Sequence, residues 1–401
     1  MNPANGRVRV AVCADFREEA WPSMDRVADE LLATMAAEHG ATIEATAVCP
    51  PFSHRATRLS SGAAALNIDR GLNRLVDYPR HVGRLASAYD VFHIVDHSYS
   101  QLVYRLPPGR SVVTCHDLDT FRSVIAPMEE PRSPLFKAMT RHILEGLRRA
   151  ACVTCDTAAV RDEILARDIA PSDRVVVAPI GVGAEFRPEA DAGADRELAA
   201  LLGSPPGAVD MLHVGSNAPR KRIDRVLQLT ADLLRQDERV RLVRVGGPFT
   251  SEQERMARDF GLTDRVSILP PLDDRHLASL YRRAALVILP SDREGFGLPV
   301  VEALACGAPV LVSDLPVLRE VGGPAAEFCP GHDRDAWARE ASRMIREGVE
   351  RPDLWLGRRD RGLAWAARFT WSRFASEVAR VYLAVAGVSA EQRPASEPCH
   401  A

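Results

Sequence analysis

The sequence predicts an α/β protein of two domains, each built around a parallel β-sheet. Short runs rich in Val, Ile and Leu alternate along the chain with longer segments of helical periodicity, which is the order of strands and crossover helices in a parallel sheet. This alternation begins at residues 8–14 and begins again at residues 211–214, after a stretch rich in Ala, Gly, Asp and Pro. With 401 residues, the chain is also too long for one ordinary core.

In the first half, the apolar run 8–14 is followed by a loop, and Ser23 is expected to cap a helix that extends to about His39. Residues 50–88 are polar and basic. Ser133 begins a basic amphipathic helix, and Thr157 is expected to cap the helix after the fifth strand. The remaining expected strands of this half are 42–48, 91–95, 111–115, 151–156 and 175–180.

In the second half, a helix is expected up to about Leu234, and a last helix from Thr370 to about Val385. The predicted division is a first domain of residues 1–187 and a second of 207–370, with the linker within 188–206. Residues 371–387 form the last helix and 388–401 a flexible tail. The expected strands are 211–214, 241–245, 266–269, 286–289, 310–312 and 326–328.

Composition excludes several classes of protein. The net charge is only −3, so no nucleic-acid partner is indicated. No run is long enough to span a bilayer and the first residues lack an apolar signal core, so we expect a cytoplasmic protein. Basic residues in 50–88 leave a weak peripheral contact with the inner face of the membrane open. The eight cysteines are scattered, and Cys152 and Cys155 are interpreted as small core residues rather than a redox or zinc pair.

The stretch around residues 291–307 has the pattern of an anion site. The apolar run 286–289 ends at Pro290, and Gly295 and Gly297 expose backbone N–H groups. Pro299 is placed where a helix tolerates proline, at its start, and Gly307 ends that helix. A strand, a glycine loop and a helix N-terminus together direct N–H groups and the helix dipole at a ligand beyond the strand.

Two carboxylates flank this loop. Glu294 precedes the glycines and Glu302 follows about one turn into the helix. Carboxylates repel phosphate, but they accept hydrogen bonds from sugar hydroxyls. A ligand with a diphosphate between two hydroxylated rings suits the whole arrangement, and such a ligand is a nucleotide sugar.

The motif Glu294-Gly295-Phe296-Gly297-Leu298-Pro299, with Glu302 eight positions after Glu294, resembles the donor signature of retaining glycosyltransferases of family 4. The resemblance implies the GT-B fold, with two Rossmann-like α/β/α domains facing across a cleft and a C-terminal helix crossing back to the first domain. It implies that Glu294 contacts the transferred sugar, that Glu302 binds the ribose, and that Gly295 to Leu298 bind the sugar and phosphates through their N–H groups.

Other positions follow from the same resemblance. His116 matches a strand-end histidine that approaches the reacting sugar, with His97 a weaker candidate on the acceptor side. Lys221 matches a phosphate-binding lysine and Arg220 the basic residue before it. Leu272 is similar in position to a residue that holds the base through its backbone.

The chain also departs from the family pattern. Ser216 replaces an arginine, and we expect Arg220 or Arg222 to supply the missing charge. Residues 21–24 replace a Gly-Gly pair, and Ile180 replaces an asparagine.

The resulting hypothesis is transfer of a sugar, with retention of configuration, from a nucleoside-diphosphate sugar to a glycan, a lipid-linked glycan or a small molecule. No cofactor and no metal are expected: Asp117 and Asp119 spell D-x-D, as do Asp333 and Asp335, but we discount both. Two alternatives stay open, a nucleotide-sugar epimerase and a catalytically degenerate protein that binds nucleotide sugars. A dehydrogenase is disfavoured because no G-x-G-x-x-G follows the first strand.

Overall fold

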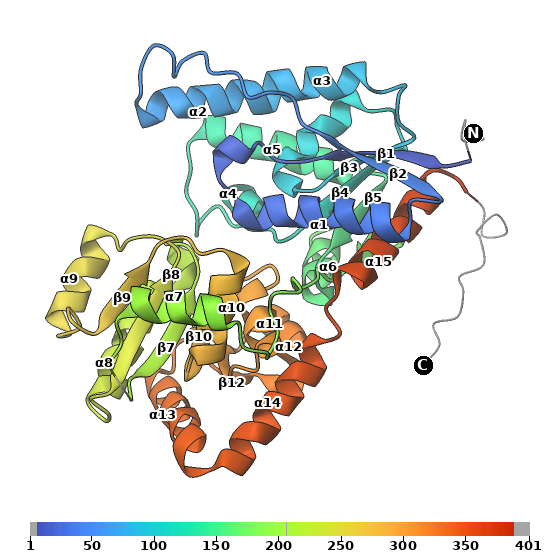
Figure 1. The fold of residues 1–401 in the computed structure, drawn as a ribbon. Coiled ribbons are helices and arrows are strands. Elements are labelled where there is room, and N and C mark those ends of the chain that lie inside the picture. The colour runs from blue at the N-terminus through green and yellow to red at the C-terminus, as the bar shows by residue number, and fades with distance from the viewer. Residues whose placement is uncertain (1–5, 206, 389–401) are drawn as a thin grey trace. The chain divides into compact units, whose positions relative to one another are not determined.

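The computed structural model describes residues 6–205 and 207–388, which form two compact units. Unit 1 comprises the chain up to Gly181 and again from Trp371, and unit 2 comprises Val182–Thr370. Each unit has its own sheet, as the sequence predicts (Figure 1). The flexible tail expected for 388–401 lies outside the described residues except for Val388.

The sheet of unit 1 has six parallel strands in the order β2-β1-β3-β4-β5-β6. Helices cover it, so β3 and β4 are buried along their whole lengths and read as unbroken apolar runs. The strands are β1 (Val8–Cys13), β2 (Ile43–Val48), β3 (Val91–Ile94), β4 (Ser111–Cys115), β5 (Cys152–Cys155) and β6 (Val175–Val177). The α-helices are α1 (Pro22–Glu38), α2 (Ala63–Leu72), α3 (Tyr78–Arg84), α4 (Arg122–Ile125), α5 (Pro134–Arg148), α6 (Ala158–Ala166) and α15 (Trp371–Val385).

The last helix, α15, returns to unit 1 and is fixed there by a buried polar chain. The Tyr382 hydroxyl lies 2.6 Å from Nδ1 of His93, and Nε2 of His93 lies 2.7 Å from the Thr114 hydroxyl. The Thr114 hydroxyl in turn lies 2.8 Å from the Thr154 hydroxyl, so this series of hydrogen bonds crosses β3, β4 and β5. Burial lowers the pKa of His93 to about 3, so this imidazole is neutral.

The sheet of unit 2 has six parallel strands in the order β12-β11-β10-β7-β8-β9. They are β7 (Val209–Val214), β8 (Val240–Val245), β9 (Val266–Leu269), β10 (Leu286–Leu289), β11 (Val310–Ser313) and β12 (Glu327–Cys329). The α-helices are α7 (Ala192–Leu202), α8 (Ile223–Leu234), α9 (Ser251–Asp259), α10 (Asp274–Arg283), α11 (Leu298–Ala305), α12 (Pro316–Gly322), α13 (Arg334–Glu350) and α14 (Pro352–Ala366). Strand β10 is central and fully buried, and the candidate site lies beyond its carboxyl end.

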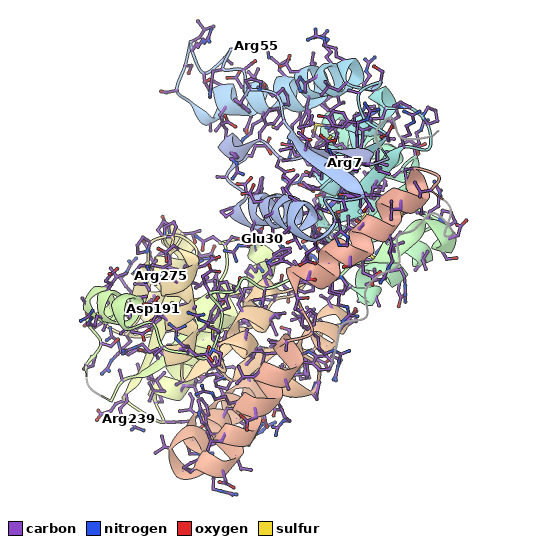
Figure 2. The ribbon with its side chains drawn as sticks, turned by 45° about the vertical axis from the view of Figure 1, so that its right-hand side comes forward. Arg7, Glu30, Arg55, Asp191, Arg239 and Arg275 are labelled. Atoms are coloured by element: carbon purple, nitrogen blue, oxygen red, sulfur yellow. The ribbon has the colours of Figure 1, made fainter. Side chains whose placement is uncertain are left out.

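The segment expected to include the linker contains helix α7. Asp191 caps α7 by accepting hydrogen bonds from the Gly193 and Ala194 amides, both at 3.1 Å. The same carboxylate pairs with Arg275 of α10 at 2.9 Å, and the two side chains lie side by side in Figure 2. This part of 188–206 therefore belongs to unit 2, which begins at Val182.

Two local predictions meet different outcomes. The prediction that Ser23 caps the first helix is wrong: α1 begins at Pro22, and Trp21 at the N-cap offers no side-chain bond. Proline is suited to the first helical position because its φ is already helical, so the helix starts two residues earlier than a Ser23 cap implies. Thr157 does cap α6, since its hydroxyl accepts from the Val160 amide at 3.2 Å.

No disulfide joins the cysteines within residues 6–205 and 207–388, and both Cys152 and Cys155 are buried on β5. That placement agrees with their interpretation as core residues. None of the helices that the structure describes has the length and apolar character needed to cross a membrane.

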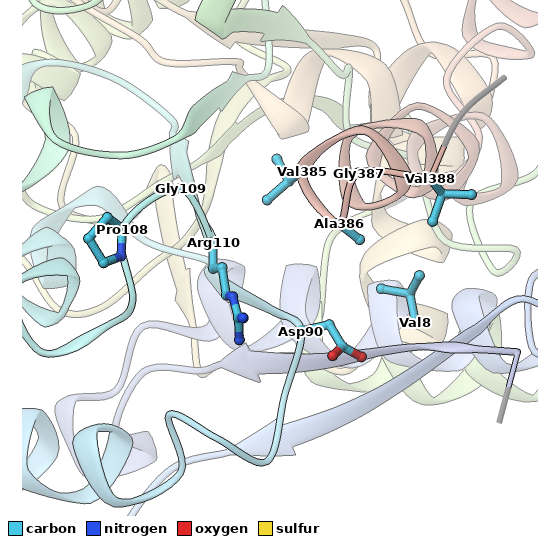
Figure 3. A pocket seen from close by; sticks show the side chains of 9 residues that line it. All are labelled: Val8, Asp90, Pro108, Gly109, Arg110, Val385, Ala386, Gly387 and Val388. Atoms are coloured by element: carbon cyan, nitrogen blue, oxygen red, sulfur yellow. The ribbon is translucent and has the colours of Figure 1, made fainter. Parts of the chain in front are cut away.

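A hollow in unit 1 lies at the amino-terminal edge of the sheet, where a ligand crevice is not expected. Its walls include Val8 at the start of β1, Asp90 before β3 and Arg110 before β4, together with the end of α15 (Figure 3). These are the amino ends of parallel strands, whereas ligands of such sheets bind beyond the carboxyl ends. The candidate site lies instead beyond the carboxyl end of β10.

Candidate functional site

The loop after β10 turns into helix α11 through a glycine with a positive φ. Gly297 is the N-cap and has a φ of 92°, and a Cβ there would lie 2.8 Å from Cδ2 of Leu318. Only glycine adopts this conformation without strain. Helix α11 starts at Leu298, one residue before the predicted Pro299, and Gly307 follows its end with a φ of 78°.

Glu294 is the most highly bonded side chain of this loop. Its carboxylate accepts two hydrogen bonds from Lys221 Nζ, at 2.6 and 2.8 Å, and one from Arg220 Nη1 at 3.1 Å. The Ser291 hydroxyl donates a fourth at 2.6 Å. The structure thus brings Glu294 into contact with two other predicted residues, Arg220 and Lys221, which lie 74 and 73 positions before it in the chain.

The charges of this triad hold each other in place. The Glu294 side chain is 4% exposed and that of Lys221 11% exposed. Burial opposes ionisation of Glu294, but Lys221 and Arg220 hold the pKa of its carboxyl below the usual value. The loop therefore contains a buried carboxylate whose charge is balanced by two cations.

Arg220 and Lys221 are positioned by a short 3-10 turn after β7. The turn covers Pro219–Lys221, and Arg222 follows in the left-handed region with a φ of 51°. The Asp292 amide donates to the Arg220 carbonyl at 2.8 Å, which ties this turn to the β10 loop. Both loops follow the carboxyl ends of neighbouring strands in the sheet, as expected for a ligand crevice.

The expectation that Arg222 supplies the charge missing at Ser216 does not fit its contacts. Arg222 pairs with Asp224 at 2.6 Å and with Asp292 at 3.1 Å. Its charge is therefore already balanced by one carboxylate of α8 and one of the β10 loop. Arg225 adds a further cation, 2.7 Å from Asp292.

The other predicted residues of this unit lie around the same loop. Glu302 is buried on α11, and its Oε2 accepts from the Tyr281 hydroxyl at 2.9 Å. Phe296 is buried and its ring packs edge-on against Phe369 with centroids 5.7 Å apart, so its side chain supports the loop. Leu272 is partly buried between β9 and α10.

In unit 1, His116 follows β4 and uses both ring nitrogens within the protein. Nδ1 lies 2.7 Å from Oδ2 of Asp156, and Nε2 lies 2.8 Å from the Val95 carbonyl. Both partners are acceptors, so the ring donates twice and is an imidazolium. Burial opposes this charge, but Asp156 raises the pKa of His116 to about 10. A bond from this ring to a sugar requires one of the two partners to be given up.

A charged cluster at the same edge was missed by sequence reasoning. Arg74 Nη2 lies 2.8 Å from Oε2 of buried Glu19, and its guanidinium covers the Tyr99 ring at 4.2 Å. Buried Asp15 lies against Asp96, and burial together with that neighbour raises the pKa of Asp15 well above its usual value. The available signal was an acidic residue directly beyond β1 and another beyond β3. His97 completes the cluster, with Nδ1 3.4 Å from Oδ1 of Asp96.

Both halves of the chain are similar to known proteins. Residues 24–186 match the family model described as Glycosyltransferase Family 4, and residues 196–354 match that of Glycosyl transferases group 1. The chain is 33% identical over 285 residues to a D-inositol 3-phosphate glycosyltransferase of Frankia alni, covering 68% of this chain and 67% of the relative. This protein belongs to glycosyltransferase family 4. A D-inositol 3-phosphate glycosyltransferase of Catenulispora acidiphila is 29% identical over 351 residues, or 81% of each chain.

Solved structures place this family 4 glycosyltransferase in the GT-B fold. Sucrose-phosphate synthase of Thermosynechococcus elongatus superimposes with a TM-score of 0.72 at 19% identity, covering 96% of this chain and all of the other. HepE of Anabaena, solved in complex with UDP and glucose, gives a TM-score of 0.69 at 16% identity, covering 94% of this chain and all of the other. The predicted fold class and enzyme class are therefore confirmed.

The D-x-D sequences of this glycosyltransferase have local roles. Oδ1 of Asp117 accepts from the Asp119 amide at 2.9 Å, and Asp333 caps α13 by accepting from Ala336 at 2.9 Å. Within the described parts of the chain, no three His, Cys, Asp or Glu residues are grouped so that they could hold a metal ion. Metal independence itself stays a prediction.

Proposed function

We propose that this glycosyltransferase moves a sugar from a nucleoside-diphosphate sugar to a hydroxyl group of an acceptor, with retention of configuration and without a metal ion. The observation that carries the proposal is the buried contact of Glu294 with Lys221 and Arg220, next to the N-terminus of α11. A carboxylate for the sugar and cations for the diphosphate lie within one hydrogen-bonded group.

The leaving group sets the main demand on the site. The bond from the sugar carbon to the phosphate oxygen breaks, and negative charge grows on the diphosphate. Lys221, Arg220 and the free N–H groups at the start of α11 supply the compensating positive charge. One cation about 4 Å from that charge contributes roughly 4 kcal/mol at an effective dielectric of about 20. Two cations can therefore account for several decades of rate if their contacts tighten in the transition state.

Glu294 has two roles in this proposal. In the unliganded protein it neutralises Lys221 and Arg220, which permits two cations to lie close together at low exposure. When the donor binds, the diphosphate takes over part of that neutralisation. One oxygen of Glu294 then becomes available to a sugar hydroxyl, and its charge supports the positive charge that develops on the ring.

Retention follows if the acceptor attacks from the face that the diphosphate leaves. The new bond joins the acceptor oxygen to the sugar carbon, and the acceptor proton passes to the departing phosphate oxygen. This route needs no carboxylate base near the acceptor. His116, which is already protonated between Asp156 and Val95, cannot act as that base, and we assign it to fixing the β4 loop and contributing positive charge.

The donor class is tested first by thermal shift against UDP, GDP, ADP, TDP and their common sugars, with and without EDTA. UDP is the leading candidate because HepE was solved with UDP and with UDP-glucose. We expect one nucleotide to raise the melting temperature equally with and without EDTA, and Lys221→Met to abolish the rise. Lack of a shift with every nucleotide would overturn the proposal. The first acceptor to assay is D-inositol 3-phosphate, the compound in the names of the relatives.

Peripheral membrane contact is a further part of the proposal. Ile68 and Leu72 of α2 and Leu75 of the turn that follows share one helical face, and they are 56%, 37% and 38% exposed. Leu59 nearby is 90% exposed, and Arg58 is exposed beside it. The sequence had suggested few apolar anchors here. Co-sedimentation with vesicles containing anionic lipid should fall when Ile68 and Leu72 are both replaced by serine, and equal sedimentation would refute the contact.

A further inference from the structure

Arg244, near the end of β8, is a buried cation without a counter-charge. Its side chain is fully buried, with an exposed fraction of 0%. Nη2 donates to the Gly215 carbonyl at 3.1 Å and to Oδ1 of Asn217, and Nη1 donates to the Gly247 carbonyl. In the described residues it makes no ion pair, and its Nε is buried without a partner. The guanidinium also contacts the Phe249 ring, whose centroid lies 5.5 Å from Cζ. A buried guanidinium with no anionic partner is costly, so its presence needs a reason.

The other cations of the neighbouring loops do not share this condition. Arg220 and Lys221 contact Glu294, and Arg222 and Arg225 contact Asp292. Arg244 is therefore a cation of this edge whose charge no carboxylate among residues 207–388 offsets. An anionic ligand bound at the carboxyl ends of β7 and β8 is the counter-charge that the arrangement lacks.

The contacts of Arg244 also orient the backbone. It lies on the same strand pair as Gly215, because Val214 of β7 is in register with Val245 of β8. The adjacent Gly246 has a φ of 133°, and a Cβ there would lie 1.8 Å from the Gly215 carbonyl oxygen. The loops that contain Gly215 and Gly246 are thus in contact, and Arg244 donates hydrogen bonds to carbonyl groups of both.

In a planar trans peptide the N–H group points opposite to the carbonyl. Because Arg244 holds the Gly215 carbonyl, and lies 3.5 Å from that of Gly246, the amides of Ser216 and Gly247 are turned away from it. Within the described residues, neither of these amides donates to a protein acceptor. Unpaired amides from two adjoining loops, backed by a fixed cation, are the elements of an anion-binding nest.

We propose that Arg244 is a positioning residue for the donor diphosphate: it turns the Ser216 and Gly247 amides toward the ligand, and the ligand balances its charge. This inference rests on the proposed function. It also assigns the charge expected at Ser216 to the neighbouring strand rather than to Arg222.

The test compares Arg244→Met and Arg244→Lys with the control Arg241→Met. Arg241 lies on the same strand, where it contacts the Ser267 hydroxyl at 3.2 Å. Affinities for UDP, UMP and inorganic pyrophosphate are measured by calorimetry, and stability by thermal unfolding. We expect Arg244→Met to weaken UDP and pyrophosphate binding by about 10- to 100-fold, the range for hydrogen bonds to charged groups. UMP binding should weaken less, the lysine variant should be intermediate, and the control should bind like the wild type.

Two further readouts separate this role from simple support of the fold. Removal of an uncompensated buried charge should leave the melting temperature without ligand unchanged or higher, while the rise caused by UDP shrinks. Adding Ser216→Arg to Arg244→Met should restore much of the UDP affinity, because it returns a cation to the same loop.

Unchanged UDP affinity in Arg244→Met, or equal losses for UDP and UMP, would refute the inference. If Arg244→Met does not fold, Arg244→Lys and the single change Ser216→Arg are measured instead. The inference would be refuted if Arg244→Lys bound UDP as tightly as the wild type and Ser216→Arg gained no UDP affinity. A wild-type protein that binds pyrophosphate but no nucleotide would contradict the proposed function and leave the anion site standing.

Discussion

Replacement of Glu294 by glutamine is the most informative single change in the donor site. The side chain keeps its shape, but one oxygen becomes an NH₂ group and both ion pairs are lost. Breaking a buried pair by removing one partner costs about 3–5 kcal/mol. Lys221 and Arg220 are 11% and 24% exposed, so water solvates them in part, and we expect the lower end, about 3 kcal/mol.

The effect of Glu294→Gln on ligands should be opposite for binding and for turnover. Lys221 and Arg220 are released to the diphosphate, so UDP should bind as tightly as in the wild type or more tightly. Turnover should fall about 10²- to 10³-fold, the usual consequence of losing one group that stabilises developing charge. A variant that is less stable, binds the product at least as well and turns over slowly would fit no role limited to folding.

The assay combines urea unfolding, calorimetry with UDP and the rate of UDP release from the donor identified by thermal shift. The matched control is Asp292→Asn, two residues away, which removes a 37% exposed carboxylate from Arg222 and Arg225. It should change turnover by less than about threefold, as expected for an exposed pair. Wild-type turnover in a folded Glu294→Gln, or a large loss of UDP affinity, would refute the reasoning.

Three other predictions follow from the same contacts. Lys221→Met should weaken UDP binding and destabilise the protein, and the double variant with Glu294→Gln should be less destabilised than the sum of the single changes, as unfolding measurements would show. Activity should survive EDTA in a UDP-release assay; loss that added metal restores would overturn the metal-free mechanism. The raised pKa of His116, about 10, stabilises the fold fully below about pH 6.5 and progressively less as pH rises through 10. The stability difference between wild type and His116→Asn should therefore shrink over that interval in urea unfolding, and a constant difference would contradict the charged state.

Strands were the best predicted part of the fold. The runs 266–269 and 286–289 form β9 and β10 at the predicted bounds. The buried strand β10 carries a continuous apolar sequence, as expected for a central strand of a parallel sheet. Strand β6 is shorter than predicted: it ends at Val177, and one further bond, from the Ala178 amide to the Cys155 carbonyl at 2.8 Å, follows it. Helix α7 was missed because Gly193 and Asp195 in its first turn disfavour a helix, although the alanines and leucines that follow favour one.

The residues of the site, like the elements of the fold, were predicted only in part. Its glycines, Glu294 and Lys221 were visible in the sequence because the loop chemistry is local. The partners of His116 and Arg244 were not visible, because they depend on strand register. Cys115 of β4 lies opposite Cys155 of β5, which brings His116 to Asp156, and the pairing of Val214 with Val245 brings Arg244 to Gly215. Single-sequence reasoning predicts strands but not which residues face each other across them.

The charge balance of unit 2 connects these findings. The ion pairs of its two loops join four cations and three carboxylates, and Arg293 in the β10 loop together with Arg244 raises the excess to three positive charges. The diphosphate of a nucleotide sugar carries about two negative charges, so it can offset most of this excess without displacing every existing pair. A neutral sugar cannot do this, and therefore the diphosphate rather than the sugar should supply most of the binding energy. Glu294 is then left to distinguish sugars, which it does only after the diphosphate has drawn the cations toward itself.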